Sequence, residues 1–205
     1  MIGRYIARQF SQPTGMLGWL IGRGMARSNE REARWTVELL GIQPDSRVLE
    51  IGFGPGVAIQ YAAERATRGH VSGIDYSQTM VAIALKRNAA KIAAGAVDLA
   101  KGDVQSMPYR DDSFDRAFAI HCIYFWRDPV ACLREIRRVL RPDGVVAITI
   151  RPLHQWQGRK PPADVFHLYR GGEVARLLSD VGFRRSRVEP YPQREKPGEC
   201  ILALK

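Results

Sequence analysis

Three closely spaced glycines are the first residues in this sequence whose spacing suggests chemistry. Gly52, Gly54 and Gly56 directly follow the segment 48–51, Val-Leu-Glu-Ile. Glycine lets a backbone approach a ligand closely and adopt positive φ angles. The pattern predicts a buried strand that runs into a loop and then a helix. In open α/β sheets, ligands bind beyond the carboxyl ends of the strands, so this loop is a candidate ligand site.

The carboxylate of Glu50, two residues before the first glycine, restricts the ligand that this loop can hold. A carboxylate that faces the loop would repel a diphosphate and attract an ammonium group. The dinucleotide fingerprint also requires a third small residue at a different spacing, and Val57 stands just after Gly56 here. The loop therefore favours a cofactor with a cationic end. The alternative is that Glu50 only forms an ion pair with a neighbouring arginine.

Further acidic residues follow the next two predicted strands. Asp75 could accept hydrogen bonds from both hydroxyls of a ribose, and Tyr76 offers an apolar face to adenine. Asp75 or Ser77 could instead cap the next helix, and the two roles are compatible. Asp103 could accept a hydrogen bond from an adenine amino group, with Val104 against the ring, although a Gly-Asp pair after a strand is also a common turn.

The rest of the chain alternates between strand and helix patterns, which would position these residues. Strands are predicted at 48–51, 71–74, 97–99, 114–120 and 145–150, and helices at 29–41, 57–66, 77–85 and 129–140. A tight turn is predicted at 142–144, a loop at 151–163, a short helix at 172–180 and a hairpin of two strands at 184–189 and 200–204. Alternating strands and helices predict a parallel sheet covered on both faces.

The length of 205 residues fits one domain with a real core. We predict a single domain, 1–205, with an N-terminal helical lid segment (1–29), a cofactor-binding core (30–150) and a C-terminal acceptor-side part with the hairpin (151–205). No apolar run is long enough to span a bilayer or to form a signal peptide, so we expect a cytoplasmic protein.

The charge balance is basic. Lys and Arg number 31 against 21 Asp and Glu, a net charge of +10, which favours anionic partners such as nucleic acid, an acidic membrane or an anionic substrate. The basic residues are scattered and no RNA-binding module is evident, so nucleic acid is not expected. Cys122, Cys132 and Cys200 are widely spaced and include no CxxC pair, so no metal site is predicted.

Taken together, these motifs resemble the class I S-adenosylmethionine (SAM)-dependent methyltransferases. The matching segments occur in the family's order, at 49–56, 73–77, 102–104, 107–108, 112–115, 133–135 and 138–144. The resemblance covers roughly residues 35–150. It implies an α/β, Rossmann-like sheet of seven mostly parallel strands with helices on both faces, an antiparallel last strand, and SAM as the cofactor.

The resemblance also implies which residues hold the cofactor. Glu50 and Gly52 would face the methionine end of SAM, Asp75 the ribose, and Ile120 or His121 the sulfonium. The adenine would lie among Tyr76, Asp103 and Val104. The implied cofactor-binding set is completed by Phe53, Gly54, Gly56 and Met80.

Methyl transfer from a sulfonium depends chiefly on proximity and alignment, and a base helps when the acceptor must lose a proton. His121, after the fourth predicted strand, is the candidate catalytic base; the alternative is a histidine that only forms part of the pocket wall. We expect an aromatic acceptor pocket from Tyr124, Phe125 and Trp126, with Tyr5, Phe10, His154, Trp156 and His167 from flanking segments. The post-strand sequence lacks the motifs of DNA-amino, cytosine-C5 and Mg²⁺-dependent catechol methyltransferases.

The N-terminal segment 1–29 combines arginines with Leu17, Trp19, Leu20 and Ile21. It could lie on an anionic membrane or close over the acceptor as a lid, and we favour the lid. We therefore predict a SAM-dependent methyltransferase, monomeric or homodimeric, that acts on a small, hydrophobic acceptor such as a lipid, quinone or natural product. The alternatives are an NAD-dependent oxidoreductase and a non-catalytic SAM-binding protein.

Overall fold

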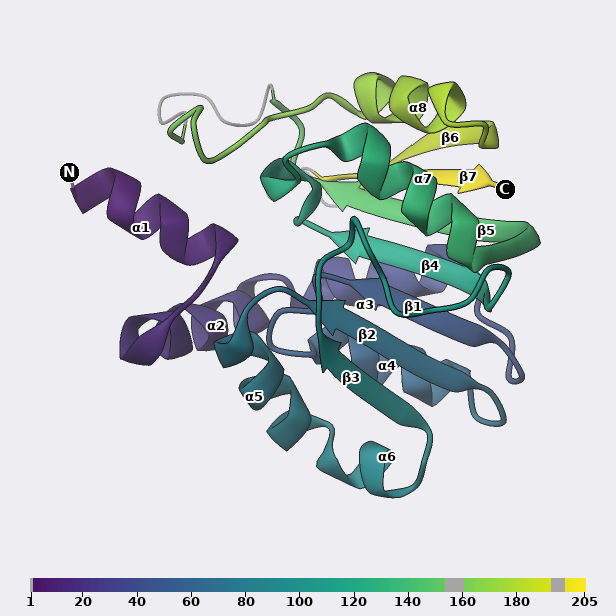
Figure 1. Ribbon diagram of the computed structural model, residues 1–205, viewed down its shortest axis with the longest axis horizontal. Helices are drawn as coiled ribbons and strands as arrows, with labels where there is room; N and C mark the ends of the chain where they lie inside the picture. The colour runs from purple at the N-terminus through teal and green to yellow at the C-terminus, as the bar shows by residue number, and fades with distance from the viewer. Residues whose placement is uncertain (1, 154–160, 193–197) are drawn as a thin grey trace.

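The computed structural model describes residues 2–153, 161–192 and 198–205 and contains one seven-stranded sheet (Figure 1). The strands are β1 (Arg47–Ile51), β2 (His70–Asp75), β3 (Val97–Lys101), β4 (Phe114–Ile120), β5 (Leu140–Ile150), β6 (Arg184–Pro190) and β7 (Glu199–Leu204). Their order is β3-β2-β1-β4-β5-β7-β6. The pairs among β1 to β5 are parallel, and β7 is antiparallel to both β5 and β6. The predicted fold class, with its antiparallel last strand and C-terminal hairpin, is confirmed.

Helices cover both faces of the sheet. They are α1 (Ile2–Ser11), α2 (Gly15–Ser28), α3 (Glu30–Leu39), α4 (Val57–Arg65), α5 (Gln78–Arg87), α6 (Ala89–Ala93), α7 (Pro129–Val139) and α8 (Gly171–Asp180), with a 3₁₀ turn at Ile123–Phe125. Along β1, Val48 packs with α3, α4 and α5 on one face, whereas Leu49 and Ile51 pack with α7 and α8 on the other. Alternate side chains of a strand point to opposite faces, so this strand is buried on both.

Side-chain caps fix the starts of two helices, and Ser77 is the one of them that the sequence predicted. The Ser77 hydroxyl accepts a hydrogen bond from the Met80 amide at 3.3 Å, which caps α5. The Asp128 carboxylate accepts from the Ala131 amide at 2.9 Å, and Pro129 occupies the first position of α7. These caps fix where the helices begin relative to the strand ends that precede them.

Two local features differ from the sequence patterns. The predicted turn at 142–144 lies within β5, because β5 starts at Leu140 and the register with β4 shifts between the pairs Phe114–Leu140 and Arg116–Val145. Asp143 has a φ of 61° in this excursion. The patterns also do not single out α1 or α6. In the described parts of the chain, no helix combines the length and apolarity needed to cross a bilayer.

The carboxyl ends of the parallel strands meet at one edge of the sheet. Figure 1 shows α1 and α2 beyond this edge, on the side to which the arrowheads of β2 and β4 point. Helix α2 packs against α5, and α1 packs against α2. The N-terminal helices therefore lie where a ligand of the predicted loop would bind.

Candidate functional site

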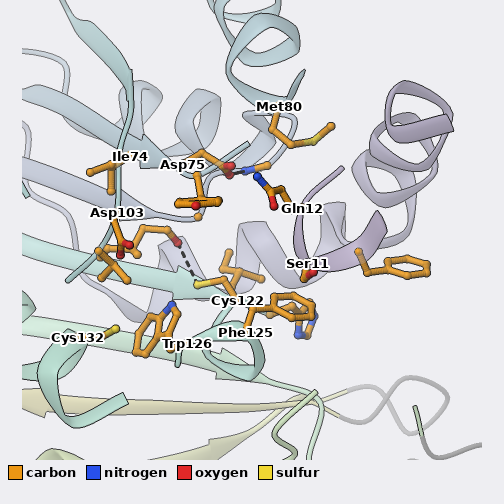
Figure 2. A pocket seen from close by; sticks show the side chains of 18 of the residues that line it. Ser11, Gln12, Ile74, Asp75, Met80, Asp103, Cys122, Phe125, Trp126 and Cys132 are labelled. Carbon is orange, nitrogen blue, oxygen red and sulfur yellow. Dashed lines mark hydrogen bonds between the residues drawn. The ribbon is translucent and has the colours of Figure 1, made fainter. Parts of the chain in front are cut away.

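A cavity of about 380 Å³ lies at the carboxyl edge of the sheet, within the usual size range of ligand pockets. Figure 2 shows Asp75 and Met80 on one side of it and Phe125 and Trp126 on the opposite side. The lining comes from residues 10–13 and from four strand ends: Gly52, Gly54, Ile74–Tyr76, Gly102–Gln105 and Ile120–Cys122. The cavity thus joins three of the motifs that the sequence singled out.

The glycine loop forms the cavity wall next to β4. Gly52 has a φ of 69°, and its amide donates to the Ile74 carbonyl at 2.8 Å. A Cβ atom at Gly52 would lie 2.8 Å from the Cβ of Cys122, so a side chain would force the wall apart. Both the backbone angle and the close approach therefore require glycine here.

Asp75 holds the glycine loop and still has acceptor capacity. Its Oδ2 accepts a hydrogen bond from the Gly54 amide and its Oδ1 accepts one from the Ser77 amide, both at 2.8 Å. Burial raises the pKa of Asp75, and these two amide contacts oppose the rise. A carboxylate offers about four lone-pair sites, so about two remain for hydroxyl donors in the cavity. The capping and ligand-binding roles predicted for this region are compatible.

Glu50 lies against the amino end of α4 and is not part of the cavity lining. Its side chain is 3% exposed, and its Oε2 has no hydrogen-bond partner among the described residues. Burial, together with the nearby Asp75 carboxylate, raises its pKa well above the usual range, against a contact with the Ile59 amide. Among the described residues, Glu50 forms no ion pair with an arginine, so nothing there supports that alternative.

His121 lies at the end of β4 in a strained conformation. Its φ is 55°, which is uncommon for a residue other than glycine, and its amide donates to the Thr149 carbonyl at 2.9 Å. Its Nε2 lies 3.0 Å from Oε2 of Glu32, and its Nδ1 lies 3.4 Å from the hydroxyl of Tyr124. An ionised carboxylate only accepts hydrogen bonds, so Nε2 carries a hydrogen and points at Glu32.

The sequence analysis missed Glu32, which belongs to α3 and is 1% exposed. It lies 89 positions before its histidine partner, so no local spacing joins the two. The available signal was a carboxylate on the same helix face as the apolar residues Ala33 and Val37, which pack against the sheet. A carboxylate buried on such a face needs a partner.

Most of the predicted cofactor residues lie on the cavity. Gly52, Gly54, Asp75, Tyr76, Met80, Asp103, Val104, Ile120 and His121 all line it. Gly56 is instead the N-cap of α4. The Phe53 side chain points into the core on the α3–α5 face, where it packs at Gly73, so only its backbone faces the loop. Asp103 also closes its own turn, because its Oδ1 accepts from the Gln105 amide at 2.9 Å.

The predicted acceptor residues divide into two groups. Phe10, Phe125 and Trp126 line the cavity. Tyr124 is buried beneath it, where its hydroxyl contacts the backbone of Arg151 and burial raises the pKa of its phenol. Four more predicted residues do not reach the cavity or cannot be placed. Tyr5 is 58% exposed and His167 is exposed, both outside the lining, whereas His154 and Trp156 lie outside the described residues.

The link between α1 and α2 falls within the predicted lid segment 1–29, but Ser11, Gln12 and Pro13 were not among the predicted site residues. Ser11, Gln12 and Pro13 line the cavity beside Phe10. The Ser77 hydroxyl donates to the Pro13 carbonyl at 2.6 Å, which ties this link to the end of β2. Cys122 also lines the cavity, its thiol donates to the Ile51 carbonyl at 3.3 Å, and burial raises its pKa.

Known proteins match both the core of the chain and its fold. A family model described as "Methyltransferase domain" matches residues 49–148. An uncharacterised methyltransferase of Bacillus subtilis is 32% identical over 133 residues, which cover 65% of this chain and 71% of that protein. A 2-phytyl-1,4-naphtoquinone methyltransferase of Synechocystis is 33% identical over 175 residues, 82% of this chain and 72% of that protein. Several further relatives are matched over less than half of their length.

The solved structures agree with the sequence matches in fold. The crystal structure of a SAM-dependent methyltransferase from Aquifex aeolicus superposes with a TM-score of 0.72 at 24% identity. The superposition covers 84% of this chain and 89% of that one. At this sequence identity the structural similarity shows only the fold. The assignment to a family is based on the sequence matches.

Proposed function

Since the chain belongs to the class I SAM-dependent methyltransferases, we propose that it methylates a small, hydrophobic acceptor of the lipid, quinone or natural-product type. The observation that carries the proposal is the aromatic part of the cavity lining, formed by Phe10, Phe125 and Trp126. Phe125 and Trp126 lie opposite Asp75 (Figure 2). Such a wall favours an apolar ring or chain over a charged metabolite. The naphthoquinone relative from Synechocystis supports the same class of acceptor.

The residues at the strand ends fit SAM. The remaining lone pairs of Asp75 suit the two ribose hydroxyls, and Tyr76 and Val104 offer apolar surface for the adenine. The ionised form of Glu50 behind the glycine loop would attract a cationic ligand, and such a ligand would in turn lower the raised pKa of this carboxyl group. When bound, SAM supplies an electrophilic methyl group on a cationic sulfur.

We propose that His121 accepts the proton of an acceptor that must lose one, and that Glu32 positions it. The carboxylate of Glu32 holds Nε2 as the hydrogen-bearing nitrogen, which leaves the lone pair on Nδ1. Nδ1 lies beside the Tyr124 hydroxyl at 3.4 Å, a long contact that an acceptor hydroxyl can replace. His121 itself lines the cavity that the acceptor would enter.

We propose that α1 and the link to α2 form a lid. Phe10 to Pro13 line the cavity, and an exposed ion pair joins Arg4 of α1 to Asp164 in the segment before α8. The link thus covers the cavity, and the ion pair ties α1 to a second part of the chain. An exposed ion pair contributes little stability, so this closure can open for the acceptor.

The test combines the purified protein, SAM labelled in its methyl group and an extract of the source cells. After reaction, the label is partitioned among organic solvent, aqueous small molecules and macromolecules. Label in the organic phase that is absent with the Asp75→Ala variant supports the proposal. Label in the aqueous or macromolecular fraction refutes a hydrophobic acceptor. The absence of transfer to any fraction would favour a protein that binds SAM without methylating these acceptors.

A further inference from the structure

The outward half of α2 presents an apolar and basic surface to solvent. Leu17, Trp19 and Leu20 are 38%, 42% and 54% exposed, and Arg23 and Arg27 are also exposed. At 3.6 residues per turn, these five side chains fall within roughly 180° of the helix circumference. We call them the α2 outer face. Three large apolar side chains in one turn and a half of an exposed helix are more than scattered surface residues.

The inner half of α2 fixes this helix to the domain. A Cβ atom at Gly18 would lie 2.7 Å from the backbone of Pro13, and one at Gly22 would lie 2.8 Å from the Cε of Met80. Glycine therefore brings α2 into close contact with the link and with α5. Because the inner face of α2 makes these contacts, the apolar side chains of the outer face point away from the domain.

All charged side chains of α1 and α2 are basic. Residues 1–29 contain no Asp or Glu. The guanidinium of Arg23 lies 4.8 Å from the ring centre of Trp19, so the cation and the aromatic ring share one patch. At the carboxyl end of α2, a shallow hollow is lined by Arg27, Ser28, Arg31 and Arg34, with Glu30 as its one acidic residue.

We infer that the α2 outer face binds the surface of an anionic phospholipid membrane. Leucine and tryptophan side chains on one helix face, flanked by arginines, are the combination that lies in a lipid interface. Leu17, Trp19 and Leu20 enter the boundary between headgroups and acyl chains, and Arg23 and Arg27 contact the lipid phosphates. A nucleic acid would match the arginines but leave the two leucines in water.

This placement goes beyond the proposed acceptor class and does not depend on it. The link from Ser11 to Pro13 lines the cavity and leads directly into α2. A membrane bound to the outer face therefore lies next to the lid, where a lipid-soluble acceptor leaves the bilayer. Vesicle binding is measurable without any acceptor. Vesicle binding can therefore fail while the proposed acceptor class holds, and the acceptor class can fail while vesicle binding holds.

The experiment is co-flotation of the purified full chain with vesicles. Vesicles of phosphatidylglycerol and phosphatidylcholine are compared with vesicles of phosphatidylcholine alone, at 0.1 M and 0.5 M salt. We expect binding to the anionic vesicles, weaker binding at high salt, and none to the neutral ones. The variant Arg23→Gln/Arg27→Gln should lower the partition coefficient roughly 30-fold. Leu17→Gln/Leu20→Gln should lower it at both salt concentrations.

The matched control is Arg65→Gln/Arg68→Gln, the same charge change on exposed residues just before β2, at the opposite edge of the sheet. It should bind vesicles nearly as the parent does. Each variant is first shown to keep the parent's thermal unfolding and SAM affinity. Equal binding to neutral vesicles, no binding to anionic ones, or an equal loss in the control would overturn the inference. So would leucine-dependent dimers without vesicle binding, since the outer face would then contact a second copy.

Discussion

Replacing Glu50 with glutamine tests the charge argument on which the cofactor assignment depends. The Glu50 side chain is 3% exposed, its Oε2 has no partner in the described structure, and the Asp75 carboxylate adds repulsion. Its pKa in the folded chain is therefore raised above that of the unfolded chain. A carboxyl group with a raised pKa stabilises the fold at pH values below its unfolded pKa. That contribution is lost as the pH rises through the folded pKa.

For the ligand-free protein, this raised pKa determines at which pH Glu50→Gln should be more stable than the parent. Near pH 5 the variant and the parent should be similar in stability, and near pH 8 the variant should be the more stable. A buried polar oxygen that is left without a hydrogen-bond partner costs about 1–3 kcal/mol. For a chain of this size, 1 kcal/mol corresponds to roughly 2–4 °C in the unfolding temperature. We therefore expect Glu50→Gln to unfold about 2–12 °C higher than the parent at pH 8.

SAM binding should change in the opposite direction. Loss of the negative charge behind the loop removes an attraction to the cationic cofactor, and we expect an affinity roughly 10–100-fold lower. The assays are thermal unfolding without ligand at pH 5 and pH 8 and calorimetric titration with SAM. Glu64→Gln, on the exposed side of α4, is the control and should change neither result appreciably. An equal gain in stability at both pH values, or unchanged SAM affinity, would refute the reasoning.

Four further predictions address the site. Asp75→Ala should weaken SAM binding by about 1.5–3 kcal/mol, since charge-assisted hydrogen bonds are lost, and an unchanged calorimetric affinity would contradict the ribose assignment. His121→Ala should keep SAM affinity but lower turnover of the labelled acceptor about 100-fold or more, and undiminished turnover would exclude the base. Glu32→Gln should lower turnover and spare SAM affinity; if only the histidine variant is slow, Glu32 has no positioning role. Gly52→Ala should lower both thermal stability and SAM affinity, because its φ of 69° and the nearby Cys122 leave no room for a methyl group, and parental values for both would contradict that interpretation.

The fold was predictable because its signals are local. The apolar residues of β1, the cap at Ser77 and Pro129 at the start of α7 each act within one turn or strand. Once alternation of strands and helices is recognised, the carboxyl edge of the sheet follows from the parallel arrangement. For this reason the residue pattern alone places Gly52 and Asp75 at the same edge of the sheet.

Side-chain direction and long-range contacts were less predictable. Phe53 stands between two glycines with positive φ angles, where the alternation of a strand no longer applies, so its burial against Gly73 does not follow from its position. Tyr124 lies in a 3₁₀ turn that rotates it beneath the cavity while Phe125 faces into it. The contact between Glu32 and His121 joins two elements that no sequence spacing relates.

The polar features around the cavity show why such a site is hard to recognise from stability rules alone. Two buried carboxylates, Glu50 and Asp75, lie close enough to raise the pKa of Glu50, and His121 keeps a strained backbone angle. Each of these destabilises the ligand-free chain, although the net charge of the whole protein is +10. A cationic cofactor would neutralise the carboxylates in place, so its binding free energy would offset the strain. The buried carboxylates that destabilise the ligand-free chain therefore lie where a positively charged ligand would stabilise them.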